Sequence, residues 1–201
     1  MVLFKSISDI ASNAPPKTVK TMVIFVIVEC SYKIIKQSEL SNMNLSALIE
    51  YLKSLPTKTL KELRYSDVYQ PEQSCHGLYF FVSPDHKKLY VGKSSSRCVA
   101  DRIGANFDSR KSGFLNSLLK KISKIQYGDI ESVNLHRTYQ TILDWEITVL
   151  FVESNITNEL TRLLSVVEGM LIFYFQQNDL CINTTNRRAN INVNATFGTL
   201  L

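Results

Sequence analysis

The chain has little cysteine, and its four cysteines lie far apart: Cys30, Cys75, Cys98 and Cys181. None of them forms a Cys-x-x-Cys pair, and none has a histidine partner at the spacing of a zinc site. This distribution argues against a zinc module. We therefore expect free thiols in a reducing compartment, and hence a cytoplasmic or nucleoid-associated protein.

Long apolar runs are also missing. Residues 22–28 are strongly apolar, but this run of seven residues is far shorter than the roughly 20 that a transmembrane helix needs. Residues 1–10 carry Lys5 and Asp9 where a signal peptide would have its apolar core. We therefore expect no membrane partner, and we expect residues 22–28 to form a buried strand or helix segment.

The excess of positive charge is moderate. A net charge of +5 and an isoelectric point of about 9.0 do not by themselves identify a nucleic-acid-binding protein. The distribution of charge says more, because residues 97–124 contain only two acids, Asp101 and Asp108. The basic residues of this stretch are Arg97, Arg102, Arg110, Lys111, Lys120, Lys121 and Lys124. Such a run is commonly a solvated helix face, and the alternative is a row of phosphate contacts.

Two short motifs stand ten residues apart, Gly77-Leu78-Tyr79 and Tyr90-Val91-Gly92-Lys93. The aromatic and β-branched run between them breaks at Ser-Pro-Asp and then resumes, which is typical of a β-hairpin. Tyr79 and Tyr90 should therefore lie on neighbouring strands. Two tyrosines on a hairpin are, taken alone, more commonly packing residues than catalytic ones.

Further motifs follow in a fixed order. After a serine-rich turn, Arg102-Ile103-Gly104-Ala105-Asn106-Phe107 predicts a short basic helix. Glu168 stands in a later helical pattern, and Asn183 follows fifteen positions beyond it. The set of motifs resembles the GIY-YIG nuclease family, over residues 77–183.

The resemblance implies an α+β fold, and a linker-like segment over residues 69–74 divides the chain into two parts. Residues 74–201 would form a small GIY-YIG-like domain whose central three-stranded antiparallel sheet is flanked by helices. Residues 1–70 would form a mainly helical N-terminal extension for recognition or dimerisation, and a homodimer through it is possible. The implied activity is that of a metal-dependent DNA endonuclease of the restriction or mobile-element type. The alternatives are a structure-selective repair nuclease and a catalytically inactive nucleic-acid-binding protein on the same fold.

The resemblance also implies roles for individual residues. The implied catalytic set is Tyr79, Tyr90, Lys93, Arg102, Glu168 and Asn183. Glu168 would hold one Mg²⁺ or Mn²⁺, and Arg102 would grip the scissile phosphate. Tyr79 or Lys93 would activate water, and Asn183 would support the site from behind. The remaining basic residues would contact nucleic acid: Arg97, Arg110, Lys111, Lys120, Lys121 and Lys124.

The chain departs from the family pattern at two positions. The turn before Arg102 is slightly longer than usual, which leaves Arg97 as a rival for the role of phosphate clamp. Asn106 stands where many members carry His or Tyr, so this position is not expected to transfer a proton. For Glu168, a purely structural alternative is an internal salt bridge with Arg162 or Arg102.

The hydrophobic pattern predicts the remaining elements. Leucines at helical spacing predict a helix within residues 44–64 that breaks at Pro56. Residues 113–124 should form a helix with Phe114 on its apolar stripe, and residues 145–152 a third strand. A buried helix carrying Glu168 should begin near residues 155–157, and residues 191–197 alternate like an edge strand.

Overall fold

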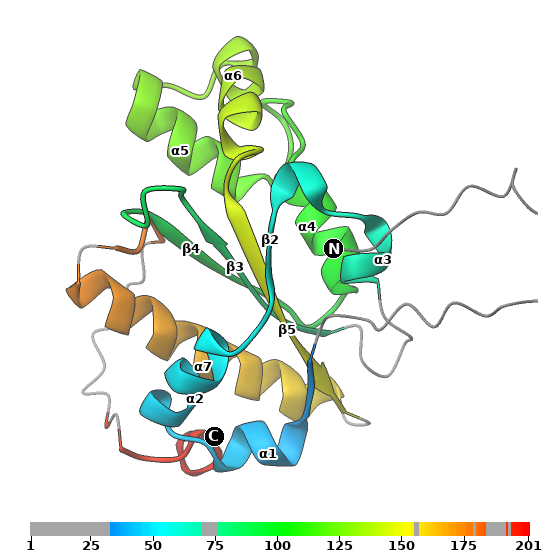
Figure 1. The fold of residues 1–201 in the computed structure, drawn as a ribbon, viewed down its shortest axis with the longest axis vertical. Coiled ribbons are helices and arrows are strands. Elements are labelled where there is room, and N and C mark those ends of the chain that lie inside the picture. Colours follow the sequence, from blue (N-terminus) through cyan, green and yellow to red (C-terminus); the bar gives the residue numbers. More distant parts are fainter. Residues whose placement is uncertain (1–32, 70–75, 155–156, 179, 184–191, 193) are drawn as a thin grey trace, which may run out of the picture.

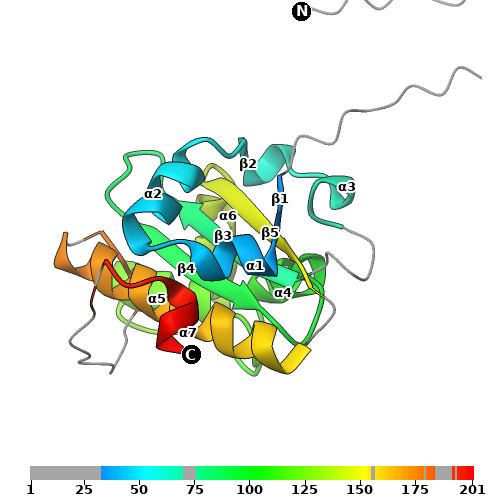
Figure 2. The same cartoon turned by 90° about the horizontal axis from the view of Figure 1, so that it is seen from below.

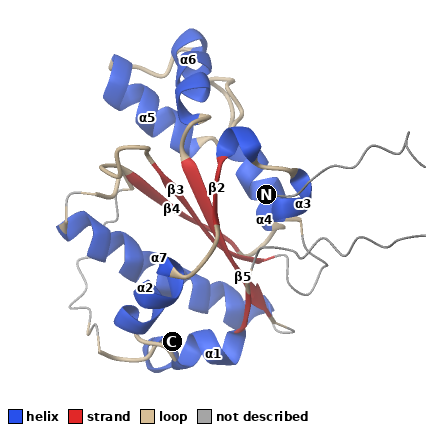
Figure 3. Cartoon of the chain, viewed as in Figure 1, coloured by secondary structure: helices blue, strands red, loops and turns tan. Residues whose placement is uncertain are grey.

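The structure is a computed structural model that describes residues 33–69, 76–154, 157–178, 180–183, 192 and 194–201. A five-stranded mixed sheet lies at its centre, between helices on both sides (Figure 3). The strands are β1 (Ile34–Lys36), β2 (Thr57–Thr59), β3 (His76–Val82), β4 (Leu89–Ser94) and β5 (Glu146–Glu153). Their order is β1-β5-β3-β4, and β2 also pairs with β5.

The predicted hairpin is confirmed as β3 and β4, which pair antiparallel with Tyr79 opposite Gly92 and Phe81 opposite Tyr90. The predicted third strand is β5, which pairs antiparallel with the other edge of β3. The expected sheet of three antiparallel strands was nevertheless too small. Strands β1, parallel, and β2, antiparallel, pair with successive halves of the outer edge of β5.

Both extra strands come from the segment that was expected to be a separate extension. They cover an edge of β5 that would otherwise present unpaired backbone groups to solvent. Ile35, Leu40 and Leu48 also pack into the same core as Leu78 and Leu150. The described residues 33–69 are therefore joined to the sheet, whereas residues 1–32, with the apolar run 22–28, lie outside the described part.

Helices cover the two faces of the sheet. On one face lie α1 (Gln37–Asn42), α2 (Leu45–Lys53), α7 (Thr157–Gln177) and the 3₁₀ helix η4 (Phe197–Leu200), as Figure 2 shows. On the other lie the 3₁₀ helix η2 (Leu60–Glu62), α3 (Tyr65–Val68), α4 (Val99–Asn106), α5 (Ser117–Tyr127) and α6 (Ser132–Ile142), as Figure 1 shows. Strand β5 is consequently buried on both faces. No helix in the described part of the chain has the length and apolar character needed to cross a membrane.

Several predicted elements have different bounds. The helix predicted within residues 44–64 is α2, which already ends at Lys53, and Pro56 precedes strand β2. The predicted helix over residues 113–124 begins only at Ser117, so Phe114 lies in the preceding loop with 93% of its surface exposed. Phe197 is buried in η4 and not in an edge strand, while residues 191 and 193 lie outside the described part.

The glycines of the two motifs are required by close packing. A Cβ atom on Gly77 would lie 2.0 Å from the carbonyl oxygen of Leu150 on β5. On Gly92 it would lie 2.1 Å from Cζ of the Tyr79 ring and 2.4 Å from its hydroxyl oxygen. The Tyr79 ring is fully buried and therefore cannot move aside. Gly92 thus allows the ring to lie directly on the backbone of β4.

We expect Gly92→Ala to lower the free energy of unfolding by about 1–3 kcal/mol, because the new methyl group overpacks a buried ring. Gly104→Ala is the matched control, since a Cβ there meets nothing within 4 Å on helix α4. It should stabilise the protein by roughly 0.5–1 kcal/mol through helix propensity. Urea denaturation measures both, and equal stability of the two variants would contradict the packing argument.

Candidate active site at the edge of strand β4

Strand β4 ends the sheet, so functional groups can reach its edge from both faces. Successive side chains of a strand point to opposite faces. Tyr90 packs on the α4 and α5 face, whereas Val91 packs on the α7 face. Lys93 also reaches α7, where it contacts Ser165 and Glu168. The motif Tyr90-Val91-Gly92-Lys93 therefore supplies chemistry to both sides of one edge strand.

Tyr79 connects the sheet to helix α4. Its hydroxyl oxygen accepts a hydrogen bond from Nδ2 of Asn106 at 3.1 Å. The same Nδ2 donates to the backbone carbonyl of Arg102 at 2.9 Å. Asn106 is fully buried, so this position holds Tyr79 and the backbone of the Arg102 turn together.

Burial raises the pKa of Tyr79 above its ordinary value, although the hydrogen bond from Asn106 and the nearby guanidinium of Arg102 act in the opposite direction. A phenolate base would need a lowered pKa instead. The phenol is also shielded from solvent. These features favour a role in positioning Arg102 over a role in water activation.

Tyr90 is similarly buried, and its hydroxyl group lies 2.6 Å from Oγ of Ser117 at the start of α5. Burial, followed by the neighbouring Tyr79, raises the pKa of Tyr90 well above its ordinary value. The two tyrosine rings lie 6.5 Å apart in a stacked arrangement. Both side chains are therefore neutral, and they pack between the sheet and helices α4 and α5.

Glu168 has a partner that the sequence did not indicate. Its Oε2 lies 3.1 Å from Nζ of Lys93, and the side chains are 22% and 29% exposed. Nζ of Lys93 also donates to Oγ of Ser165 at 2.7 Å. The alternative partners considered from the sequence, Arg162 and Arg102, are not in ion-pair contact with it. The Glu168 carboxylate is thus paired with a basic side chain and is partly exposed.

Asn183 covers the free edge of β4. Its Oδ1 accepts from the backbone N–H of Val91 at 2.8 Å, and its Nδ2 donates to the Val91 carbonyl at 2.9 Å. The segment before it runs parallel to β4, because Leu89 donates to Leu180 and accepts from Ile182. The amide takes the place of a neighbouring strand directly beside Gly92.

A cleft of about 460 Å³ opens where these elements meet. It is lined by Lys93, Ser94, Ser95, Ser96, Arg97, Arg102, Phe114, Leu115 and Glu168. Lys93, Arg102 and Glu168 from the predicted catalytic set therefore share one cavity with Arg97. Three cations face a single carboxylate there, and neither arginine forms an ion pair within the described residues.

The turn that carries Arg97 is fixed by its own backbone. Oγ of the buried Ser94 donates to the carbonyl of Arg97 at 2.5 Å, and Nδ1 of His76 lies 3.1 Å from the same oxygen. The Arg97 side chain remains exposed, while Arg102 is half-buried. Both arginines thus reach the cleft, with Arg102 more firmly held.

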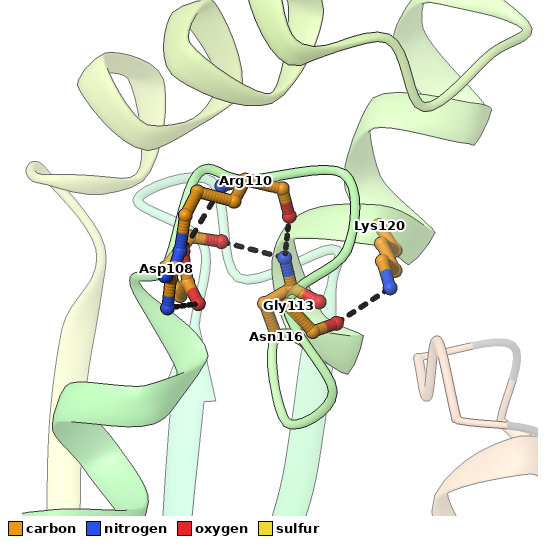
Figure 4. Close-up of polar contacts among 5 residues, drawn as sticks. All are labelled: Asp108, Arg110, Gly113, Asn116 and Lys120. Atoms are coloured by element: carbon orange, nitrogen blue, oxygen red, sulfur yellow. Dashed lines mark hydrogen bonds and ion pairs between the residues drawn. The ribbon is translucent and has the colours of Figure 1, made fainter.

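Three of the remaining predicted phosphate contacts already have partners within the fold. Arg110 makes a two-pronged ion pair with Asp108, at 2.8 and 2.7 Å, and this pair lowers the pKa of Asp108 to about 2. Lys111 pairs with Glu131 at 2.6 Å. Figure 4 shows Lys120 donating to the Gly113 carbonyl, at 2.7 Å.

The last two lysines of this set also differ from each other. Lys121 is half-buried, and burial lowers its pKa. Lys124 is exposed. Of the six predicted nucleic-acid contacts, only Arg97 lines the cleft.

The side chains that line the cleft limit which metal ion could bind there. Within the described ranges, no three His, Cys, Asp or Glu side chains come together. Glu168 is the single carboxylate that lines the cleft. One partly exposed carboxylate fits Mg²⁺, which keeps several waters and can take its other ligands from a substrate phosphate. It does not fit an ion that requires a cage of protein ligands.

Some contributing residues were missed in the sequence. Ser94 fixes the turn that carries Arg97, Ser165 binds Lys93, and Ser117 binds Tyr90. Single serines carry no sequence signal for such roles.

Comparison of the chain with protein-family models, with curated proteins and with solved structures gives no match.

We expect Asn183→Ala to destabilise the fold by at least about 1–3 kcal/mol, because the buried N–H and C=O groups of Val91 both lose their partner. Asn178→Ala is the control: the exposed Asn178 donates to the Tyr174 carbonyl on α7, and its loss should cost no more than about 0.5 kcal/mol. Thermal unfolding of both variants measures the difference. A stable Asn183→Ala protein would show that the edge of β4 does not depend on this amide.

Proposed function

We propose that the chain is a metal-dependent endonuclease of the GIY-YIG type that hydrolyses phosphodiester bonds in DNA, of the restriction or mobile-element kind. The observation that carries this proposal is the convergence of Lys93, Arg102 and Glu168 in one cleft beside the hairpin that bears Tyr79 and Tyr90. The motifs suggest the assignment, and the proximity of their residues in the fold supports it.

The charge of the cleft suits a phosphodiester. Three cationic side chains against one carboxylate attract an anion, and guanidinium groups bind phosphate oxygens through a planar fork of donors. Arg102 is the better clamp of the two arginines, because Asn106 and Tyr79 fix its turn from below. Arg97, on an exposed turn, would guide the neighbouring phosphate.

Hydrolysis also needs an activated water and a stabilised leaving oxygen. Mg²⁺ bound to Glu168 would supply a Lewis acid that lowers the pKa of a bound water and neutralises phosphate charge. Lys93 lines the cleft and Tyr79 does not, so Lys93 is the group that can reach an attacking water. Tyr79 and Tyr90 then act as rigid supports, and Asn183 holds the strand.

One observation favours a second candidate, a nucleic-acid-binding protein without catalysis. Glu168 is held by Lys93 at 3.1 Å and has no further acidic neighbour in the cleft. In that case the ion pair is structural and the two arginines bind phosphate without cleaving it. A repair nuclease that recognises DNA structure remains the alternative biological role for an active enzyme.

We expect purified protein to nick supercoiled plasmid in Mg²⁺ and to be inactive in EDTA. Glu168→Gln should abolish nicking while DNA binding survives, and Arg102→Ala should slow it by about 100-fold or more through loss of a preorganised charge. Glu159→Gln, on the exposed first turn of the same helix, should retain activity. Gel electrophoresis of the plasmid forms reads the result.

Two outcomes would decide against this assignment. Full Mg²⁺-dependent cleavage by Glu168→Gln would remove the carboxylate from the mechanism. DNA binding by the wild type without any cleavage in Mg²⁺ or Mn²⁺ would favour the non-catalytic protein.

The ion pairs predict which basic residues determine salt dependence. In the Glu168→Gln background, Arg97→Gln should reduce the slope of log K against log salt by about 1, because one phosphate contact is lost. Arg110→Gln should change the slope much less, since Asp108 already engages Arg110. Fluorescence anisotropy at several salt concentrations measures both. Equal slopes for the two variants would place the phosphate contacts elsewhere.

A further inference from the structure

Phe114 is the most exposed large apolar side chain of the described residues, at 93%. It lies in the loop between α4 and α5, outside the apolar stripe that the sequence predicted for it. Its neighbour Leu118, four positions along, is fully buried. The fold therefore gains no core packing from Phe114, and its position needs another explanation.

The loop that presents Phe114 is held on both sides. Asn116 is fully buried, and its Nδ2 donates to the carbonyls of Asp108 and Arg110 at 2.6 and 2.9 Å. The Gly113 N–H donates to the Arg110 carbonyl at 2.9 Å, and Lys120 donates to the Gly113 carbonyl (Figure 4). Hydrogen bonds thus hold the backbone on both sides of Phe114, while its side chain is exposed to solvent.

Gly113 is itself required at this place. A Cβ there would lie 2.7 Å from Nδ2 of Asn116 and 2.8 Å from a carboxylate oxygen of Asp108. A larger residue at position 113 would therefore have to displace these two side chains. Because this backbone is already held, little loop ordering is needed when Phe114 binds a partner.

The surroundings of the ring indicate the chemistry of that partner. Phe114 lines the same cleft as Arg97 and Arg102, which form no ion pair within the described ranges. A flat apolar ring beside unpaired guanidinium groups matches a nucleotide, which has a flat base and an anionic phosphate. Base stacking on aromatic side chains beside a cationic groove is a general mode of single-strand recognition.

We propose that Phe114 stacks on an unpaired nucleobase of the DNA strand whose phosphate binds at Arg97 and Arg102. This inference rests on the proposed nuclease function and specifies its substrate. The faces of a base inside a duplex are covered by its neighbours, so the stacked base belongs to a single strand or to a locally unpaired nucleotide. The cleft therefore takes up an unpaired nucleotide, either in a single strand or at a locally opened position of a duplex.

The test measures binding without divalent metal in the full-length Glu168→Gln protein. The probes are a short fluorescent single strand, the same strand with abasic sites throughout, and the matching duplex. Phe114→Ala should weaken binding of the normal single strand by about tenfold or more, as expected when a stacked base is lost. It should leave binding of the abasic strand and of the duplex unchanged.

Two further substitutions separate stacking from simple apolar contact. Phe114→Trp should retain the affinity of the wild type, whereas Phe114→Leu, which is apolar but has no ring face, should behave like Phe114→Ala. Ile125→Ala is the control, because Ile125 is 55% exposed on α5 and does not line the cleft. It should bind all three probes like the parent protein.

The possible failures are distinguishable. If Phe114→Leu binds as well as the parent, or if Phe114→Ala weakens the normal and abasic strands equally, base stacking is overturned while nucleic-acid binding stands. If Phe114→Ala instead converts a dimer into a monomer in sedimentation experiments, the ring belongs to an interface between copies and the proposal is overturned. If the parent binds none of the three probes, the proposed function fails as well.

Discussion

The packing of the Tyr79 ring on the bare backbone of Gly92 is the constraint on which the rest of the site depends. The two residues are cross-strand partners, and no side chain larger than hydrogen fits between them. With the ring flat on β4, its hydroxyl group reaches Asn106 and thereby fixes helix α4 against the sheet. Arg102 takes its position from that helix. The spacing of the Gly77 and Tyr90 motifs in the sequence thus helps to determine where the guanidinium group of Arg102 lies.

A second constraint is that β4 lies at the edge of the sheet. In the interior of a sheet, groups on opposite faces are separated by the backbone layer. At the edge, Lys93 with its partner Glu168 on one face and Arg102 on the other line the same cleft. An exposed edge also invites pairing with another strand. The Asn183 amide binds the backbone N–H and C=O groups of Val91 at this edge.

The hairpin, β5 and α7 were predictable because each is long and strongly patterned, and the glycines of the hairpin have local steric reasons. Strands β1 and β2 could not be recognised, since each has three residues and exists only through pairing with β5. The partner of Glu168 was also missed, because Lys93 is 75 positions away in the chain and only the crossing of α7 over β4 brings them together. The basic run looked uniform in sequence, yet Asp108 and Glu131 engage Arg110 and Lys111. Such pairing is a property of the folded loop.

The central claim is that nucleic acid and a divalent ion meet at the edge of β4. Paramagnetic line broadening tests it most directly, with ¹⁵N-labelled protein, a short DNA strand and a trace of Mn²⁺. The account predicts that the amide signals of Gly92, Lys93 and Glu168 broaden first, and that they do so less in the Glu168→Gln protein. Broadening that is strongest around the surface acids Asp129 and Glu131, with the cleft signals unchanged, would contradict it.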